Sequence, residues 1–295
     1  MTNPFAAEGD WFKGNLHTHT TESDGRVSPQ EAVTGYAAHG YDFLSITDHR
    51  KVTDISKLDN KGMLLIPGIE MSADQSELGA SYHVVAIGAK GPMEYDTEWD
   101  CQKLIDYGNE NAECVFIAHP SWSSLTFADM IGLDGYIGVE VYNTGCHFEV
   151  GRGESATQWD DLLARGKKLF GFAVDDAHFR ILDSWVGYIM VKAPECTYDA
   201  IIAAIKAGHF YASNGPQIHN LELDGNRLLV ECSPCWELRV ICPMPGRGNT
   251  AYHIGQRPPY TSVEFELSEN TVPFRIECLD ETGNKAWSNP IWFGE

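Results

Sequence analysis

The sequence lacks a long hydrophobic run, and this absence argues against a membrane-spanning helix, which needs about 20 apolar residues in succession. The 295-residue chain contains no run of such length. Its start, MTNPFAAEGDWFKGN, also lacks the basic segment and following apolar stretch of a secretory signal. We therefore expect a cytoplasmic protein without membrane contact, whose eight cysteines are reduced.

Positive charge is also scarce, with 21 Lys and Arg against 42 Asp and Glu and a net charge of −21. Such a charge argues against nonspecific binding of nucleic acid, so we expect no nucleic-acid polymer as a partner. Divalent cations bound to some of the carboxylates would offset part of the surplus. A small anionic substrate therefore stays compatible with the composition. The sequence leaves the oligomeric state open.

The first two thirds of the chain alternate short apolar runs with helical patterns, without internal repeats or a low-complexity linker. Ser28-Pro29-Gln30-Glu31 predicts a helix start, with Ser as cap, Pro in the first turn and Glu three residues after the cap. This alternation predicts parallel strands in a β/α layer or barrel. We predict strands at residues 15–19, 43–47, 63–66, 83–87, 114–118, 136–141 and 169–174, and further helices at 96–111, 158–165 and 198–207.

The pattern changes after Gly215-Pro216, where helical patterns stop and short alternating strands follow. These strands are predicted at residues 221–223, 228–232, 238–242, 262–267 and 274–279. We therefore predict an α/β protein of two domains, a β/α barrel over residues 1–215 and a small antiparallel β-sandwich over 216–295.

The clearest chemical feature is the segment Leu16-His17-Thr18-His19-Thr20. Alternate residues of a strand point the same way, so both imidazoles can face one side. Neutral imidazoles suit a divalent transition metal, although a lone H-x-H is weak evidence.

Further acids and histidines follow at or near the ends of successive predicted strands. In a β/α barrel such ends converge at one face, where active sites are built. We therefore predict a metal site with room for two or three ions. Nitrogen and oxygen ligands without cysteine suit Zn, Mn or Fe(II). The candidate ligands are His17, His19, Asp24, His49, Glu70, His83, His119, Asp176 and His178.

The order H-x-H, S-D-G, T-D-H, G-x-E, an isolated His, A-H-P and D-x-H resembles the PHP (polymerase and histidinol phosphatase) family over residues 13–215. The tail, with Phe210-Tyr211-Ala212-Ser213-Asn214-Gly215-Pro216 and Ala286-Trp287-Ser288-Asn289-Pro290-Ile291, resembles a two-domain subgroup related to carbaryl hydrolases. The resemblance implies a distorted (β/α)7 barrel that holds two or three metals.

The resemblance also implies how the ligands divide. His17, His19, Glu70 and Asp176 would surround one metal. Glu70 would bridge to a second metal with His83 and His119, and Asp24, His49 and His178 would hold a third. Asp176 is preferred over Asp175 because it forms the D-x-H pattern with His178.

These ligands predict a hydrolase in which a metal-bridging hydroxide attacks the substrate, since bound metals lower the pKa of water. His178 or a nearby acid, Asp176, would protonate the leaving oxygen. Arg50 and Arg180 are candidate phosphate clamps, and His147 is a candidate substrate contact.

The leading interpretation is a phosphoesterase acting on a small phosphorylated metabolite. The alternatives are a carboxyl or carbamate ester hydrolase with the same metal site, and an inactive barrel that serves as a binding module.

Other polar residues carry weaker signals. Asp48 could orient a ligand or cap a strand, and Glu140 with Asn143 could reach the site or form a buried structural pair. Cys232 and Cys235 form half of a zinc motif with no second half, so we expect plain buried thiols. Structural or surface roles are expected for the remaining histidines, His39, His209, His219 and His253.

Overall fold

The computed structural model describes residues 3–252, 258–268, 271 and 273–292, apart from the side chains of residues 73 and 74. His253 lies outside the described residues.

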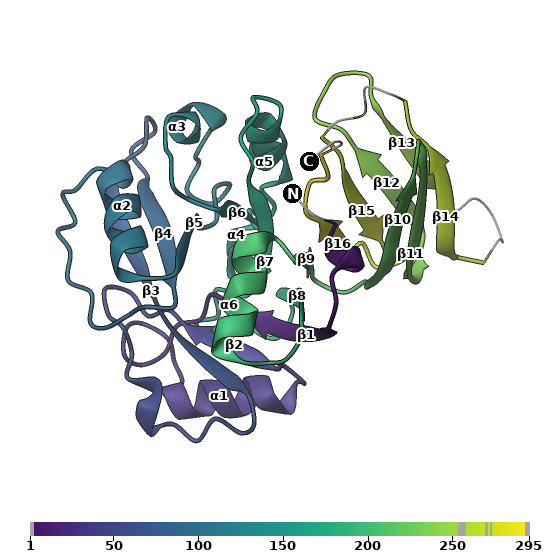
Figure 1. Cartoon of the computed structure of the whole chain (residues 1–295). Coiled ribbons are helices and arrows are strands. Elements are labelled where there is room, and N and C mark those ends of the chain that lie inside the picture. Colours follow the sequence, from purple (N-terminus) through teal and green to yellow (C-terminus); the bar gives the residue numbers. More distant parts are fainter. Residues whose placement is uncertain (1–2, 253–257, 269–270, 272, 293–295) are drawn as a thin grey trace.

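Figure 1 shows a larger α/β lobe and a smaller lobe of strands beside it. In chain order, the structure forms η1 (Pro4–Ala6), β1 (Asp10–Asn15), α1 (Pro29–Ala38), β2 (Phe43–Ile46), η2 (Ile55–Lys57), β3 (Leu64–Gln75), β4 (Ser81–Ile87), α2 (Cys101–Asn111), β5 (Cys114–Ile117), α3 (Phe127–Ile131), β6 (Gly138–Asn143), α4 (Thr144–Val150), α5 (Ala156–Leu163), β7 (Phe170–Val174), β8 (Tyr188–Ala193), α6 (Tyr198–Ala207), β9 (Phe210–Ser213), β10 (Ile218–Asp224), β11 (Arg227–Cys235), β12 (Glu237–Ile241), β13 (Gly248–Tyr252), β14 (Tyr260–Glu266), β15 (Arg275–Leu279) and β16 (Lys285–Ser288).

Most predicted elements of the first lobe are present, with shifted ends. Ser28 caps α1 and forms the predicted capping box with Glu31, and Pro29 lies in the first turn. Helix α2 begins five residues later than predicted, because the Asp100 side chain accepts a hydrogen bond from the backbone N–H of Lys103. The predicted strand at residues 15–19 is wrong beyond its first residue, since β1 ends at Asn15.

Within the described residues, thirteen strands form one sheet in the order β13-β12-β15-β16-β9-β8-β1-β2-β3-β4-β5-β6-β7. Parallel pairing joins β1 to β2, β2 to β3, β5 to β6 and β6 to β7. The expectation of parallel strands throughout is wrong for β4, which is antiparallel to both β3 and β5. Only a short turn separates β3 from β4, whereas a parallel pair needs a crossover of a dozen or more residues.

The predicted barrel is not closed. Strand β7 lies at one edge of the sheet and pairs with β6 alone among the described strands. Closure of a seven-stranded barrel would pair β7 with β1, but β1 pairs with β2 on one side and with β8 on the other. Among the described residues, no strand pairing joins β7 to β1, and an isolated bridge between Thr18 and Ala177, beyond the ends of both strands, links the two.

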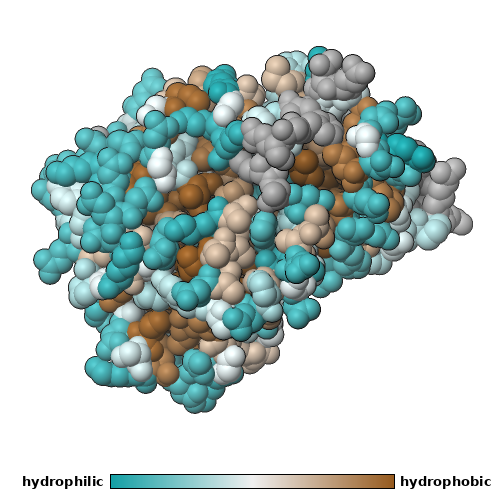
Figure 2. All heavy atoms as spheres, viewed as in Figure 1, coloured by the Kyte–Doolittle hydropathy of each residue, from teal (hydrophilic) through white to brown (hydrophobic). Residues whose placement is uncertain are grey.

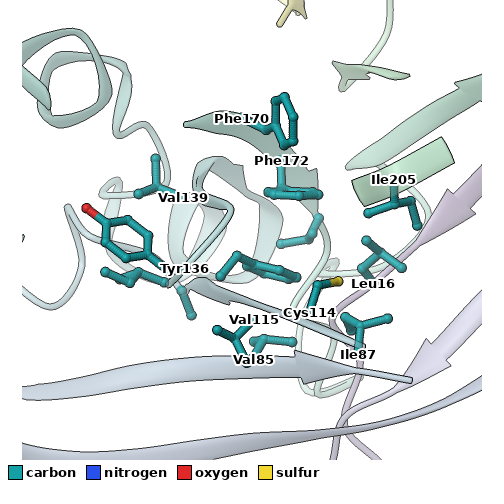
Figure 3. Close-up of a cluster of buried hydrophobic side chains, with 14 of the residues drawn as sticks. Leu16, Val85, Ile87, Cys114, Val115, Tyr136, Val139, Phe170, Phe172 and Ile205 are labelled. Atoms are coloured by element: carbon teal, nitrogen blue, oxygen red, sulfur yellow. The ribbon is translucent and has the colours of Figure 1, made fainter. Parts of the chain in front are cut away.

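The main apolar cluster of the larger lobe is formed by the strands and by the inner faces of α2, α5 and α6, and a second, smaller cluster includes Tyr36 of α1 and Leu44 of β2. Figure 3 shows Leu16, Val115, Phe172 and Ile205 pointing into the main cluster. Burial of such side chains is worth about 1.5–3 kcal/mol each, so this cluster holds the strand ends in place.

The smaller lobe contains a three-stranded antiparallel sheet, β10-β11-β14, and four strands that continue the large sheet. The link is β16, which pairs with β9 through Ala286 and Ser213. Residues of both layers, such as Val230 and Ile276, share one apolar cluster. An independent β-sandwich is thus not confirmed, because the large sheet runs without a break from one lobe into the other. The boundary after residue 215 stays a prediction.

Among the described residues, no helix has the length and apolar character needed to span a bilayer. Hydrophilic residues cover much of the face in Figure 2, interrupted by several hydrophobic patches.

Candidate metal centre

The H-x-H segment is held by a second loop that also carries candidate ligands. The backbone N–H of Asp176 donates to the carbonyl of His17, and that of His19 donates to the carbonyl of Ala177, each at 2.9 Å. Thr18 and Ala177 form a parallel bridge. This pairing places the residues after β1 beside those after β7, so ligands more than 150 residues apart meet at one edge of the sheet.

Glu70 lies at the centre of the candidate ligands and is 1% exposed. Its Oε2 is 3.2 Å from Nε2 of His17, 3.1 Å from Nε2 of His19 and 3.0 Å from Nδ1 of His49. Its Oε1 is 2.6 Å from Nδ1 of His83 and 3.3 Å from Nε2 of His119. The two oxygens of this carboxylate thus face two different groups of imidazoles, as a bridging ligand requires.

The first group, His17, His19, Glu70 and Asp176, matches the predicted first ligand set. Nε2 of His17 is 3.1 Å from Nε2 of His19 and 3.3 Å from Oδ1 of Asp176, which lies 2.9 Å from Nε2 of His19. Ligands about 2.0–2.2 Å from one ion lie about 2.9–3.4 Å from one another in tetrahedral or octahedral geometry. The observed separations fit this range.

Three buried atoms of the cluster have no hydrogen-bond partner, namely Oε2 of Glu70, Oδ1 of Asp176 and Nδ1 of His19. Buried polar atoms are nearly always satisfied, and an orphaned group calls for an explanation such as an ion. Lone pairs of carboxylates and imidazoles that converge without hydrogen bonds are what a divalent cation needs. The residues present therefore fit a metal.

The second and third groups each share a residue with the first, Glu70 and His19 respectively. His49, Glu70 and His83 form one, with His119 also beside Glu70, and His19, Asp24, His49 and His178 form the other. Nε2 of His178 is 3.3 Å from Oδ1 of Asp24, and Nε2 of His49 is 3.8 Å from the same oxygen. The structure thus brings all nine predicted ligands together, and His49 contributes to two groups. Whether each of the nine binds metal stays a prediction.

Glu140 orients several of these ligands. Its Oε1 is 2.6 Å from Nδ1 of His17, while its Oε2 accepts hydrogen bonds from the backbone N–H of His119 and from Nδ2 of Asn143, both at 2.8 Å. A carboxylate on Nδ1 fixes the tautomer that presents Nε2 to a metal. Of the two alternatives left open for Glu140, the geometry supports the one in which it reaches the site.

Asp175 and Asp48 have different roles from their neighbours in sequence. Asp175 accepts hydrogen bonds from the hydroxyl of Tyr36 and from the backbone of residues 185–187, so it fixes a loop and faces away from the cluster. Asp48 accepts hydrogen bonds from Thr20, Ser23 and Thr53. The preference for Asp176 over Asp175 therefore agrees with the geometry.

The electrostatics of the cluster favour ionised carboxylates. Burial alone would raise the pKa of Glu70, but His17, His83 and His49 hold that pKa well below its usual value. Burial lowers the pKa of His19, and Asp176 and Glu70 more than offset this and raise it to about 9. The buried carboxylates thus require nearby positive charge, which a divalent metal supplies when the imidazoles bind it in their neutral form.

Two of the ligands have strained backbones, since φ is 28° at His119 and 52° at Asp176. Left-handed backbone at a residue other than glycine costs about 1–3 kcal/mol and persists only where the surroundings enforce it. The hydrogen bond from the N–H of His119 to Glu140 and that from the N–H of Asp176 to His17 provide such enforcement.

A cavity of about 390 Å³ opens over the cluster. Its wall includes Asp24, His49, Glu70, His83, His119, Asp176 and His178, together with Trp122, Ile181 and Arg180. Arg50 and His147 are not among the lining residues. Arg50 lines a separate surface hollow with Tyr95 and Trp99, and the ring of His147 packs against Tyr142 and Phe148. Among the three predicted substrate contacts, only Arg180 borders the cavity.

Sequence reasoning gave no role to Trp122. Its indole ring lies 5.0 Å from the ring of His119 and is partly exposed to the cavity. The proximity of Trp122 to His119 along the chain was the only available signal.

Comparison with known proteins supports the fold. No model of a protein family matches the chain. A two-domain protein from Bacteroides vulgatus, described as containing a predicted PHP-like metal-dependent phosphoesterase, is 15% identical, with a TM-score of 0.53 over 96% of this chain and 95% of its own. An amidohydrolase from Chromobacterium violaceum is 14% identical, with a TM-score of 0.43 over 56% of this chain and 87% of its own.

A curated relative, a 5'-3' exoribonuclease from Haemophilus influenzae, is 34% identical over 79 residues. The matched stretch covers 25% of this chain and 28% of that relative. The chain thus shares the fold of a two-domain PHP-like protein, while the resemblance to carbaryl hydrolases stays a prediction.

Proposed function

We propose that the protein is a metal-dependent hydrolase, and specifically a phosphoesterase that cleaves a small phosphorylated molecule. The observation that carries the proposal is the convergence of Oε2 of Glu70 and Oδ1 of Asp176, both buried and without hydrogen bonds, on the imidazoles of His17 and His19. This arrangement suits metal binding and has no evident structural purpose.

The residues have separable roles. We propose that His17, His19, Glu70 and Asp176 hold one divalent ion and that Glu70 with His83 and His119 holds a second. Zn, Mn and Fe(II) all suit these ligands. Bound metals of this kind lower the pKa of water toward neutrality and polarise the scissile ester.

His178 lies at the edge of the cavity. Its Nδ1 is 3.0 Å from the backbone carbonyl of Asp176, so a proton on Nδ1 leaves Nε2 free to face Asp24. This nitrogen either completes a third metal set with Asp24 and His49 or, when protonated, donates to the leaving oxygen. The number of bound ions decides between these two roles.

Arg180 supports phosphate as the recognised group. It borders the cavity, and its Nη2 is 3.0 Å from Oδ2 of Asp24, with the side chain about half exposed. A guanidinium matches the geometry of phosphate oxygens. The descriptions of the exoribonuclease and of the two-domain phosphoesterase also favour phosphate over carboxyl esters. The modest cavity and the net charge of −21 favour a small molecule over a polymer.

The test is Glu70→Gln, with Glu222→Gln on β10 as the matched control. Both proteins are assayed on a panel of phosphate and aryl carboxyl esters with added Mn, Zn or Fe(II), and bound metal is counted by elemental analysis. We expect Glu70→Gln to lose metal and turnover while keeping its fold, since one amide oxygen cannot bridge two ions. Activity that survives complete metal removal would falsify the metal-dependent mechanism, and turnover of carboxyl esters alone would refute the phosphoesterase assignment.

A further inference from the structure

Three cysteine side chains meet in the smaller lobe, far from the histidine cluster. Cys232 and Cys235 lie on β11, and Cys278 lies on β15. Their sulfur atoms are all within 4.8 Å of one another. The exposed fractions of the three residues are 2%, 0% and 0%, so the sulfurs lie inside the apolar cluster of this lobe.

The three cysteines lie where the chain passes from one sheet to the other. The pairing of β11 with β14 shifts register between Glu231 and Cys235. Immediately afterwards, the backbone N–H of Trp236 donates to the carbonyl of Leu279 in the large sheet at 2.7 Å. Cys278, the residue before Leu279, therefore faces the crossing segment from the other layer. This cross-layer contact explains why the sequence showed only half of a metal motif.

We propose that Cys232, Cys235 and Cys278 form a thiolate site for one thiophilic d10 cation, Cu(I) or Zn(II), that ties β11 to β15. Thiolates select these two ions over hard cations. The described part of the chain supplies three sulfurs here and no fourth Cys or His. Such a set suits three-coordinate Cu(I), and it suits Zn(II) when an oxygen completes the shell.

Metal binding requires deprotonated sulfur. A cation bound by the three converging sulfurs would therefore displace their thiol protons to solvent.

The site would also serve the stability of the lobe. Its apolar cluster is much smaller than the main cluster of the larger lobe, and small cores gain from a metal or another cross-link between layers. An ion bound by both β11 and β15 would stabilise the folded state alone, because the three sulfurs are not assembled in the unfolded chain.

The test uses the full-length reduced protein, titrated without oxygen in two separate arms, with Cu(I) and with Co(II) as the spectroscopic substitute for Zn(II). The readout is ultraviolet sulfur-to-metal charge-transfer absorption, which imidazole and carboxylate ligands do not produce. Cys235→Ser and Cys278→Ser are compared with Cys242→Ser, which removes a buried cysteine outside the group. Circular dichroism confirms that each variant is folded.

We expect one equivalent of thiolate absorption in at least one arm for the wild type and Cys242→Ser, and its loss in Cys278→Ser and Cys235→Ser. The same ion should raise the thermal midpoint of the wild type but not that of Cys278→Ser. No charge-transfer band in the wild type in either arm overturns the proposal, whatever the variants do. A band of equal size in folded Cys278→Ser also overturns it.

Discussion

Glu140→Gln offers a sharp test of the candidate metal centre. The substitution replaces one oxygen atom beside His17 by an NH2 group and leaves every candidate ligand side chain unchanged. The carboxylate Oε2 of Glu140 accepts two hydrogen bonds, from the backbone of His119 and from the amide of Asn143, while Oε1 faces Nδ1 of His17. A glutamine has one acceptor oxygen, and the two donors require it on the Oε2 side. The amide nitrogen must then face His17 and donate to its Nδ1.

This donation inverts the tautomer of neutral His17. The proton moves to Nε2, the atom that lies 3.2 Å from Glu70 and 3.3 Å from Asp176, so the lone pair needed for the metal is lost. Loss of such an orienting partner costs about 10–100-fold in metal affinity, and this range equals about 1.4–2.7 kcal/mol. We do not expect complete loss, since His19, Glu70 and Asp176 stay in place.

The assay is metal affinity by competition with a chromogenic chelator, alongside thermal unfolding. The matched control is Asp48→Asn, which also alters a buried carboxylate near the cluster but one bonded to Thr20, Ser23 and Thr53. We expect the control to lose stability with little change in metal affinity. Wild-type affinity in folded Glu140→Gln, or an equal loss in the control, would refute the tautomer argument.

Two further predictions concern other parts of the chain. Arg180→Gln should raise KM for a phosphate ester about 10–150-fold with a smaller change in kcat, since one charged hydrogen bond is worth about 1.5–3 kcal/mol. Arg50→Gln changes a residue outside the cavity and should leave KM unchanged. Steady-state kinetics of both variants measure this, and a larger increase of KM in Arg50→Gln than in Arg180→Gln would refute the prediction. Arg275→Met should lower the free energy of unfolding by about 3 kcal/mol, because this 1% exposed guanidinium makes two 2.8 Å hydrogen bonds to Asp160 on α5 and one to Glu277. Urea unfolding measures this loss, with Arg227→Met as the control that breaks only the exposed pair with Glu264. An equal loss of stability in the control would contradict the prediction.

Most of the candidate ligands were found from the sequence because they follow predicted strands, where local patterns are informative, although Glu70 lies within β3 and His83 near the start of β4. His49 follows β2 within three residues and His119 follows β5 within two, and the sheet brings those ends together. The role of Glu140 could not be settled in the same way. A buried acid at a strand end looks the same whether it binds His17 or a structural partner, and only the three-dimensional pairing separates the two.

The limits of the fold prediction have a similar cause. The capping box at Ser28 is local, and it placed the start of α1 correctly. The open edge at β7 and the continuous sheet through β16 depend on which strands pair, and those partners lie far apart in the sequence. Short strands such as β8 and β9 resemble any apolar segment until their neighbours are known. Arg50 illustrates the same point at the candidate site. It directly follows His49 in the sequence, yet it does not line the cavity.

The position of His83 links the topology to the chemistry. The other candidate histidine ligands follow strands, whereas His83 lies near the start of β4. Strand β4 runs antiparallel to β3, and His83 pairs with Ser72, two residues beyond Glu70. The start of a reversed strand lies at the same edge of the sheet as the ends of its forward neighbours. A parallel β4 would carry His83 to the opposite edge, yet its Nδ1 is 2.6 Å from Glu70. The reversal of β4 is therefore what makes His83 available as a candidate ligand.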